Sequence, residues 1–148
     1  MVVPLITFFE IKNFPDDVYK AVGKIIQSSQ ELERDYKTLA TKLKLKVKDI
    51  NNSSLNKLND ALKKSGNLTP KEYNNLKEVI RVRNDINHKF FIEIFDEMSK
   101  GYDERIVRFS NVLNYSQCVI YEANDVIKNK IDALDGKTIM RRTAFDDN

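Results

Sequence analysis

The stretch from Thr69 to Phe91, TPKEYNNLKEVIRVRNDINHKFF, contains the clearest local signal in the chain. Its first four residues, Thr69-Pro70-Lys71-Glu72, form a capping box with proline at the first helical position, so a helix is predicted to begin at Pro70. Apolar residues then recur at spacings of three and four, which is typical of a helix that buries one face. We expect this helix to extend to about Ser99 and to need other helices to cover it.

Three further segments show the same periodicity. A long helix is predicted from about Pro15 to Leu45, a shorter one from about Ser54 to Lys64, and a last long one from about Asp103 to Leu134. Ser53 is the expected N-cap of the shorter helix, and Gly66 its left-handed stop. No hairpin signal separates alternating strands. The sequence therefore predicts an all-α fold, a compact up-and-down bundle of four to five helices.

Length and composition limit the class of protein. The 148 residues fit a single domain, 1–148, with a core at about 15–135 and a polar tail at 137–148. Lys and Arg total 25 against 22 for Asp and Glu, and the net charge of +3 permits a nucleic-acid partner without requiring one. A single Cys cannot form an internal disulfide, and one His with one Cys cannot form a zinc site from these residue types alone. We expect no metal and no cofactor.

Hydropathy argues against a membrane protein. No stretch approaches the roughly 18 consecutive apolar residues of a membrane-spanning helix. The apolar start of the chain, Met1–Phe9, lacks the basic region of a secretory signal and is followed by Glu10. We therefore expect a cytoplasmic protein with no membrane partner.

Two polar residues interrupt the apolar face of the helix that begins at Pro70. At about 100° per residue on a straight helix, Arg83 and Asn87 project from the middle of that face. A guanidinium group in an apolar face costs several kcal/mol if it stays unpaired. Arg83 must therefore be paired inside the molecule, face a second molecule, or lie where the helix breaks.

The simplest explanation of Arg83 is structural. An acidic residue of the first long helix, such as Glu33 or Asp35, would then hold its guanidinium group. In the same interpretation Arg81 pairs with Asp85 one helical turn later. The histidine that follows, at position 88, would be a surface imidazole.

Helix geometry constrains any joint role of Arg83 and His88. His88 stands five positions after Arg83, which is about 140° round a straight helix. Two side chains so placed cannot point at the same atom. They converge only if the helix starts afresh near Asn84–Asn87, or if two chains meet at this helix.

The string Arg83-Asn84-Asp85-Ile86-Asn87-His88 resembles the signature of the higher eukaryote and prokaryote nucleotide-binding (HEPN) superfamily. That signature is an arginine, a polar residue, a short spacer and a histidine on an inner helix of a small all-α bundle. The resemblance covers most of the chain as architecture but only about six residues as a motif. It implies a metal-independent endoribonuclease in which the 2′-OH of the RNA attacks the adjacent phosphate. Implied catalytic residues are Arg83 as phosphate clamp, Asn84 as positioning group and His88 as general acid and base.

The residue types suit that chemistry. Imidazole exchanges protons near neutral pH, and guanidinium offers two parallel hydrogen bonds to phosphoryl oxygens. The reaction needs both a base and an acid, yet the chain has one His, so a symmetric homodimer would supply two. The resemblance likewise implies a composite site at a twofold axis. We expect a homodimer whose axis passes near His88, with Arg81 and Lys89 binding RNA nearby.

Basic residues elsewhere give a weaker signal for RNA. The densest positive patch is the run Lys42–Lys48, in which lysine alternates with Leu or Val. Two interpretations stay open for it. It is either a solvated helix end, favoured by the helix dipole, or a surface that follows the phosphates of a nucleic acid.

A second resemblance competes with the nuclease interpretation. The run from Leu55 through Gly66, together with Glu72-Tyr73 and Asn87-His88, resembles the central region of the mannitol operon repressor-like family. That family consists of helical regulators that are not thought to cut RNA. It implies a non-catalytic regulator or interaction module. A HEPN-like bundle that binds a nucleotide or a partner without cutting is a third alternative.

The HEPN resemblance also bears on protein partners. It implies a toxin or phage-defence effector, with an antitoxin or regulatory protein as partner. Some toxins of the superfamily carry a tyrosine two residues after the histidine, which a nucleotidyltransferase antitoxin modifies. Phe90 stands at that position here, so this form of neutralisation is not expected.

Overall fold

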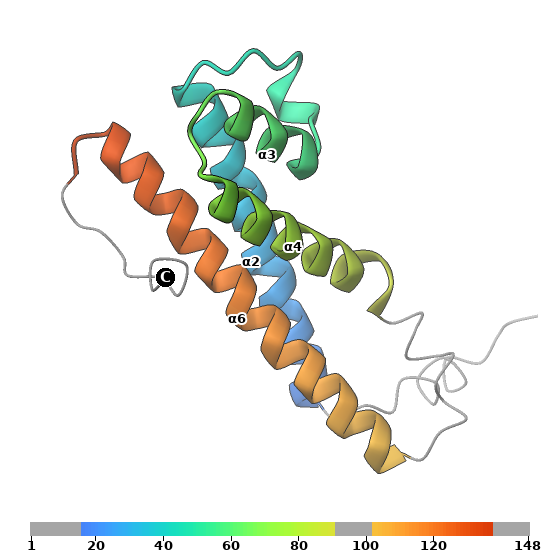
Figure 1. The fold of residues 1–148 in the computed structure, drawn as a ribbon. Coiled ribbons are helices and arrows are strands. Elements are labelled where there is room, and N and C mark those ends of the chain that lie inside the picture. Colours follow the sequence, from blue (N-terminus) through green and yellow to red (C-terminus); the bar gives the residue numbers. More distant parts are fainter. Residues whose placement is uncertain (1–15, 91–101, 138–148) are drawn as a thin grey trace, which may run out of the picture.

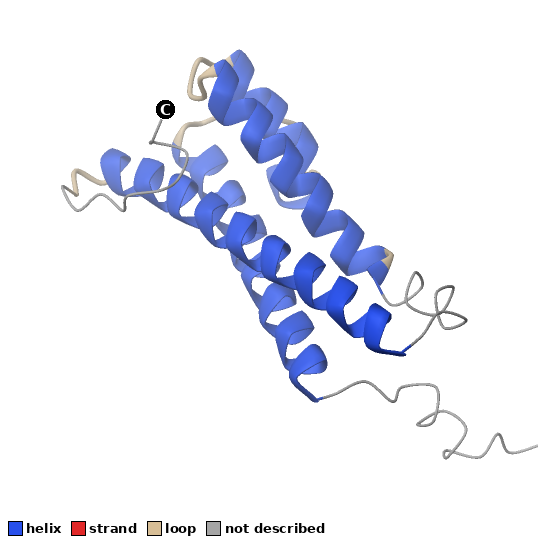
Figure 2. Ribbon diagram, turned by 60° about the horizontal axis from the view of Figure 1, so that its bottom comes forward, coloured by secondary structure: helices blue, strands red, loops and turns tan. Residues whose placement is uncertain are grey.

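The computed structural model describes residues 16–90 and 102–137 (Figure 1). These ranges contain helices and loops and no strand, as Figure 2 shows, so the prediction of an all-α bundle is confirmed. The elements are α2 (Asp16–Lys42), the 3-10 turn η1 (Ile50–Asn52), α3 (Leu55–Lys64), α4 (Pro70–His88) and α6 (Tyr102–Leu134). The prediction that the helix from Pro70 continues to about Ser99 is wrong, because α4 ends at His88. The apolar start of the chain and the tail after residue 137 lie outside the described residues.

Helices α2 and α6 are the longest, and they run side by side in the same direction (Figure 1). Lys42, the last residue of α2, donates from Nζ to Oδ1 of Asp135, just after α6, at 2.8 Å. Helix α4 runs in the opposite direction. Glu72 in its first turn accordingly pairs with Lys130 near the end of α6 at 2.9 Å. The helix directions therefore do not simply alternate along the chain.

One apolar core joins the four helices. Its fully buried Leu and Ile residues recur at helical spacing, and each contributes about 1.5–3 kcal/mol by leaving water. They are Ile25, Leu32, Leu39, Leu58, Leu62, Leu76, Ile80, Ile120 and Ile127. This core fixes which faces of α2 and α4 meet. It does not include Leu134, the last residue of α6, which is 48% exposed.

A buried polar bridge fixes α3 and α4 against α2. Tyr36 of α2 is fully buried and donates its hydroxyl hydrogen to Oδ1 of Asn59 in α3 at 3.1 Å. Asn59 in turn donates from Nδ2 to the carbonyl of Tyr73 in α4 at 3.3 Å. Burial raises the pKa of Tyr36, so the hydroxyl remains a donor. Three helices are thereby held in one register.

Local signals set the helix borders. The capping box is formed as predicted, with Thr69 and Glu72 bonded reciprocally, and Gly66 takes the left-handed conformation at φ 78°. The prediction of Ser53 as N-cap of α3 is wrong by one residue. Ser54 is the cap, because its hydroxyl accepts from the amide of Lys57 at 3.2 Å, while the hydroxyl of Ser53 donates to a loop carbonyl.

Helix α2 ends before the predicted Leu45. Its last helical residue is Lys42, and Lys44 takes φ 52°, which is incompatible with a continuing right-handed helix. The chain then passes through an irregular segment, which reaches η1 and the start of α3.

Helix α4 is continuous through Asn84–Asn87, so it does not start afresh inside the motif. It ends instead directly after His88, where the cap residue Lys89 takes φ −123° and ψ −20°. His88 is therefore the last helical residue of α4.

Candidate functional site

Arg83 lies on the side of α4 that faces α2, and its side chain is only 15% exposed. Its Nη2 donates to Oε2 of Glu33 at 2.6 Å, and its Nη1 donates to Oδ1 of Asn84 at 3.0 Å. The structural explanation of Arg83 is thus confirmed as a contact, with Glu33 as the partner. Asp35, the other acid considered, accepts from its neighbour Arg34 at 3.1 Å.

Glu33 is shared by two cations. Its second oxygen, Oε1, accepts from Nζ of Lys37, one turn further along α2, at 2.8 Å. The hydrogen bond from Lys37, with the positive charges of Lys37 and Arg83, keeps the pKa of Glu33 below its usual range, although partial burial opposes this. One carboxylate therefore links two helices and compensates one of two positive charges.

A cavity of about 310 Å³ opens where α2, the start of α3 and the end of α4 meet. All three residues predicted to be catalytic line this one cavity, and His88 is exposed there. Its lining consists of Glu33, Ser53, Ser54, Leu55, Asn56, Arg83, Asn84 and His88. Because Ser54 is the N-cap of α3, the positive end of that helix dipole borders the cavity and favours an anion there.

Two polar atoms in this region are incompletely satisfied. Nε of Arg83 and Oδ1 of Asn87 are buried and find no hydrogen-bond partner within the described part of the chain. Such atoms carry a free-energy cost and tend to occur where a ligand or water binds. Arg83 therefore has one N–H donor, at Nε, that is not used within the described residues while Nη2 is bonded to Glu33.

Arg81 and Lys89, the predicted RNA-binding residues, are absent from the lining of this cavity. Arg81 donates to Glu78 at 2.5 and 2.9 Å and to Asp85 at 2.8 Å. The hydrogen bond and charge of Glu78 raise the pKa of Arg81. Lys89 Nζ lies 3.7 Å from Asp85, so acids of α4 itself compensate both basic residues.

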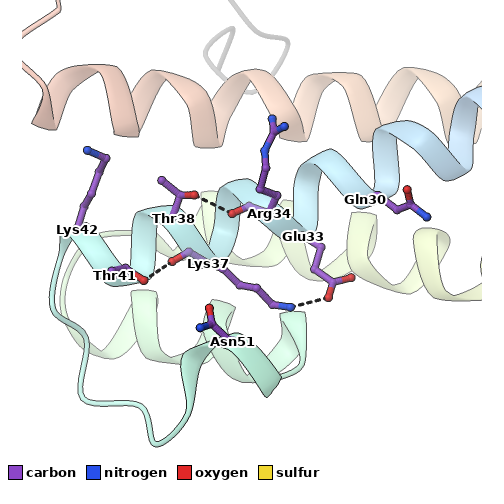
Figure 3. A pocket seen from close by; sticks show the side chains of 8 residues that line it. All are labelled: Gln30, Glu33, Arg34, Lys37, Thr38, Thr41, Lys42 and Asn51. Atoms are coloured by element: carbon purple, nitrogen blue, oxygen red, sulfur yellow. Dashed lines mark hydrogen bonds and ion pairs between the residues drawn. The ribbon is translucent and has the colours of Figure 1, made fainter.

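A larger and more open cavity of about 700 Å³ lies along α2 (Figure 3). It shares Glu33 with the cavity of His88, and Figure 3 shows the Glu33 and Lys37 side chains pointing toward each other. The other lining residues are Gln30, Arg34, Thr38, Thr41, Lys42 and Asn51. Glu33 therefore lines both cavities, and Lys37 lines the larger one.

The basic run Lys42–Lys48 does not form a helix end as a whole. Leu43, Leu45 and Val47 are half-buried against the core, and the alternating lysines are exposed. Only Lys42 lies in the last turn of α2.

Sequence reasoning missed part of this site. Glu33 was expected only as a structural partner, and Lys37, Ser53, Ser54 and Asn56 were not predicted to lie near the motif. The spacing of Glu33 and Lys37 by four does indicate a pair on one helix face. It does not indicate that this face meets Arg83, which depends on how α2 and α4 pack.

No three His, Cys, Asp or Glu side chains are placed to hold a metal ion in residues 16–90 and 102–137. In the same ranges no helix combines the length and apolar character needed to cross a membrane. No protein-family model, curated protein or solved structure matches the chain. Membership of the HEPN superfamily and the resemblance to mannitol operon repressor-like proteins both stay predictions.

Proposed function

We propose that this protein is a metal-independent endoribonuclease of HEPN type, a cytoplasmic toxin or phage-defence effector held in check by an antitoxin or regulatory protein. The observation that supports it is the cavity at the end of α4, which Arg83, Asn84 and His88 line together. The positive end of α3 borders the same cavity and favours a phosphate there.

Each residue has a role in this proposal. One His88 takes the proton from the attacking 2′-OH, and a second His88 gives a proton to the leaving 5′-oxygen. The exposure of His88 at the end of α4 lets RNA reach it. Arg83 stabilises the charge on the phosphoryl oxygens. Asn84 is a positioning residue, because its Oδ1 accepts from Nη1 of Arg83 at 3.0 Å and so orients the guanidinium plane.

The proposal includes a homodimer. Arg83 and His88 leave the continuous helix α4 about 140° apart and border the shared cavity from different directions, and one chain offers a single imidazole. A second copy that meets the exposed His88 would bring a second imidazole, and thus both an acid and a base, to one substrate.

The test is RNA cleavage in the presence of a chelator. Wild type is compared with His88→Ala and Arg83→Ala, with Lys71→Ala as control at an exposed basic residue of the same helix. We expect a loss of about a hundredfold or more for the first two and little change for the control. Cleavage by all variants alike, or by none including wild type, would contradict the proposal.

Mixed dimers test the composite site. Wild-type and His88→Ala subunits are unfolded and refolded together in equal amounts, and the mixture is assayed beside each protein alone. If one site needs an imidazole from each chain, a hybrid dimer has only one and is inactive, so the mixture keeps about a quarter of the wild-type activity. A mixture that keeps about half of the activity, or a strict monomer in light scattering, would remove the dimer from the proposal.

A second candidate is the non-catalytic regulator or interaction module. Two ion pairs and one exposed position favour it: Arg83 pairs with Glu33, Arg81 pairs with Asp85, and His88 lies at the surface. Together they account for all three basic side chains without a substrate. If folded wild-type protein, with Arg83, Asn84 and His88 all present, cleaves none of the RNAs tested, the non-catalytic function is favoured over the nuclease.

A further inference from the structure

Two cations meet one carboxylate at the border of the proposed site. Glu33 accepts from Arg83 at 2.6 Å through one oxygen and from Lys37 at 2.8 Å through the other. The two cationic side chains are 15% and 23% exposed, and that of Glu33 is 36% exposed. The carboxylate is therefore the most accessible member of a cluster with a net charge of +1.

We infer that Glu33 occupies a phosphate-binding place formed by Arg83 and Lys37, and that an RNA phosphodiester displaces it. Lys37 then becomes a second phosphate-binding residue, and Glu33 a built-in competitor of the substrate. The inference rests on the proposed function, since it assigns part of the substrate site of that nuclease.

The chemistry of the cluster fits this exchange. A carboxylate and a phosphodiester both offer two charged oxygens to neighbouring donors, and guanidinium binds either through parallel hydrogen bonds. The buried Nε of Arg83, which has no partner in the described residues, is an additional donor on the same guanidinium group. With Glu33 in place, the group uses Nη2 alone toward this anion position.

The surroundings allow Glu33 to leave. Its side chain lines both cavities, that of His88 and the larger one along α2, and is open to water on that side. A rotation of the side chain would free Arg83 and Lys37 without any movement of α2. The two cavities would then form one path, along which an RNA backbone runs from His88 past Lys37.

The alternative is that Glu33 only ties α4 to α2. The two interpretations predict opposite results for Glu33→Gln, which removes the charge but keeps the size. A competitor that loses its charge lets RNA bind more tightly. A purely structural link that loses its charge loosens Arg83 and leaves RNA binding unchanged or weaker.

The experiment measures binding of a 2′-O-methyl RNA oligonucleotide, which cannot be cleaved by 2′-OH attack. Glu33→Gln and Lys37→Gln are compared with two matched controls on the same helix, Glu31→Gln and Lys24→Gln, which do not line either cavity. Circular dichroism melting of each variant checks the fold. Lys37→Gln retains the Arg83–Glu33 pair, so it reports on binding even if Glu33→Gln melts early.

We expect about tenfold tighter binding for Glu33→Gln and about tenfold weaker binding for Lys37→Gln, with the salt dependence of Lys37→Gln reduced by about one phosphate contact. Both controls bind like wild type. If Glu33→Gln and Lys37→Gln also bind like wild type while cleavage still depends on His88, the inference is wrong and the nuclease stands. If wild type neither binds nor cuts RNA, both are wrong.

Discussion

Arg81 and Arg83 stand two residues apart on α4, and both are paired with acids, yet their surroundings differ. Arg81 is 59% exposed and bonded to two acids of its own helix, Glu78 and Asp85. Arg83 is 15% exposed and bonded across to Glu33 of α2. The first pairing is local and lies in water, whereas the second joins two helices beside a cavity.

This difference shows that the number of arginines in the motif does not tell which of them acts on a substrate. Ion pairs in water contribute little, about 0–1 kcal/mol, because solvent competes for both partners. A guanidinium group that is mostly withdrawn from water depends on its partner, and it acts strongly on any anion that replaces that partner. Arg83 is therefore the arginine whose substitution should matter for both folding and function.

The largest contrast is expected in RNA cleavage when each arginine is replaced by lysine. Arg83→Lys keeps the charge but loses the planar pair of donors, so we expect a loss of about a hundredfold. Arg81→Lys should stay within about threefold of wild type, because lysine keeps the charge beside Glu78 and Asp85 at an exposed position. Initial rates on a labelled RNA measure both, and equal losses would end the distinction between the two arginines.

The free energy of unfolding should also fall more on replacement of Arg83 than of Arg81, although the contrast is smaller than in RNA cleavage. Arg83→Met leaves Glu33 with Lys37 alone and removes the link between α2 and α4, at a cost of about 1–2 kcal/mol. Arg81→Met should cost at most about 0.5 kcal/mol. Urea unfolding gives both losses of unfolding free energy. A larger loss for Arg81→Met than for Arg83→Met would show that the pair of Arg83 and Glu33 does not stabilise the packing of α2 and α4.

Acid should weaken the link through Glu33. Its pKa in the folded protein is below the ordinary value of 4.5, chiefly through the hydrogen bond from Lys37, so the stabilisation is complete above that pH and is lost as the pH falls through the folded value. Between about pH 5 and 3, wild type should therefore lose more stability than Glu33→Gln. Glu78→Gln is the matched control for Glu33→Gln. Arg81 also lowers the pKa of Glu78, but Glu78 lies at an exposed site. Urea midpoints across this range that fall in parallel for wild type and Glu33→Gln would count against the role of Glu33.

Salt should give the smallest contrast. Raising NaCl from about 0.1 to 1 M shortens the screening length from about 10 to 3 Å. The small cost of Arg81→Met should then disappear, while most of the cost of Arg83→Met remains, since its pair with Glu33 is partly shielded from solvent. Urea unfolding at both salt concentrations measures this, and a full loss of the Arg83 effect would show that its pair behaves as a surface pair.

Sequence patterns predicted the fold well where local chemistry decides it. The capping box at Thr69 and Glu72 and the left-handed Gly66 were predicted because their signals lie within a few residues. The N-cap of α3 was missed by one position, because two serines adjoin and only tertiary placement selects Ser54. Helix ends are thus less predictable than helices.

The candidate site was predictable only in part. Arg83, Asn84 and His88 follow from a motif in one stretch of sequence, and Glu33 from the need to pair a buried guanidinium. That Lys37 shares Glu33, and that Ser54 brings the start of α3 to the cavity, depends on how α2, α3 and α4 pack. No pattern along the chain encodes the distance between separate helices.

The bridge through Asn59 restricts how the core can change during evolution. Removing the hydroxyl of Tyr36 alone orphans Oδ1 of Asn59, and replacing Asn59 by Leu alone orphans the hydroxyl, so each single step costs about 1–3 kcal/mol. Changing both together removes this donor and acceptor at once and leaves only the bond from Nδ2 of Asn59 to the carbonyl of Tyr73 lost, so it costs less than the two single changes added together. The two positions are therefore expected to show strong epistasis, and lineages should exchange Tyr36 and Asn59 for apolar residues as a pair rather than one at a time.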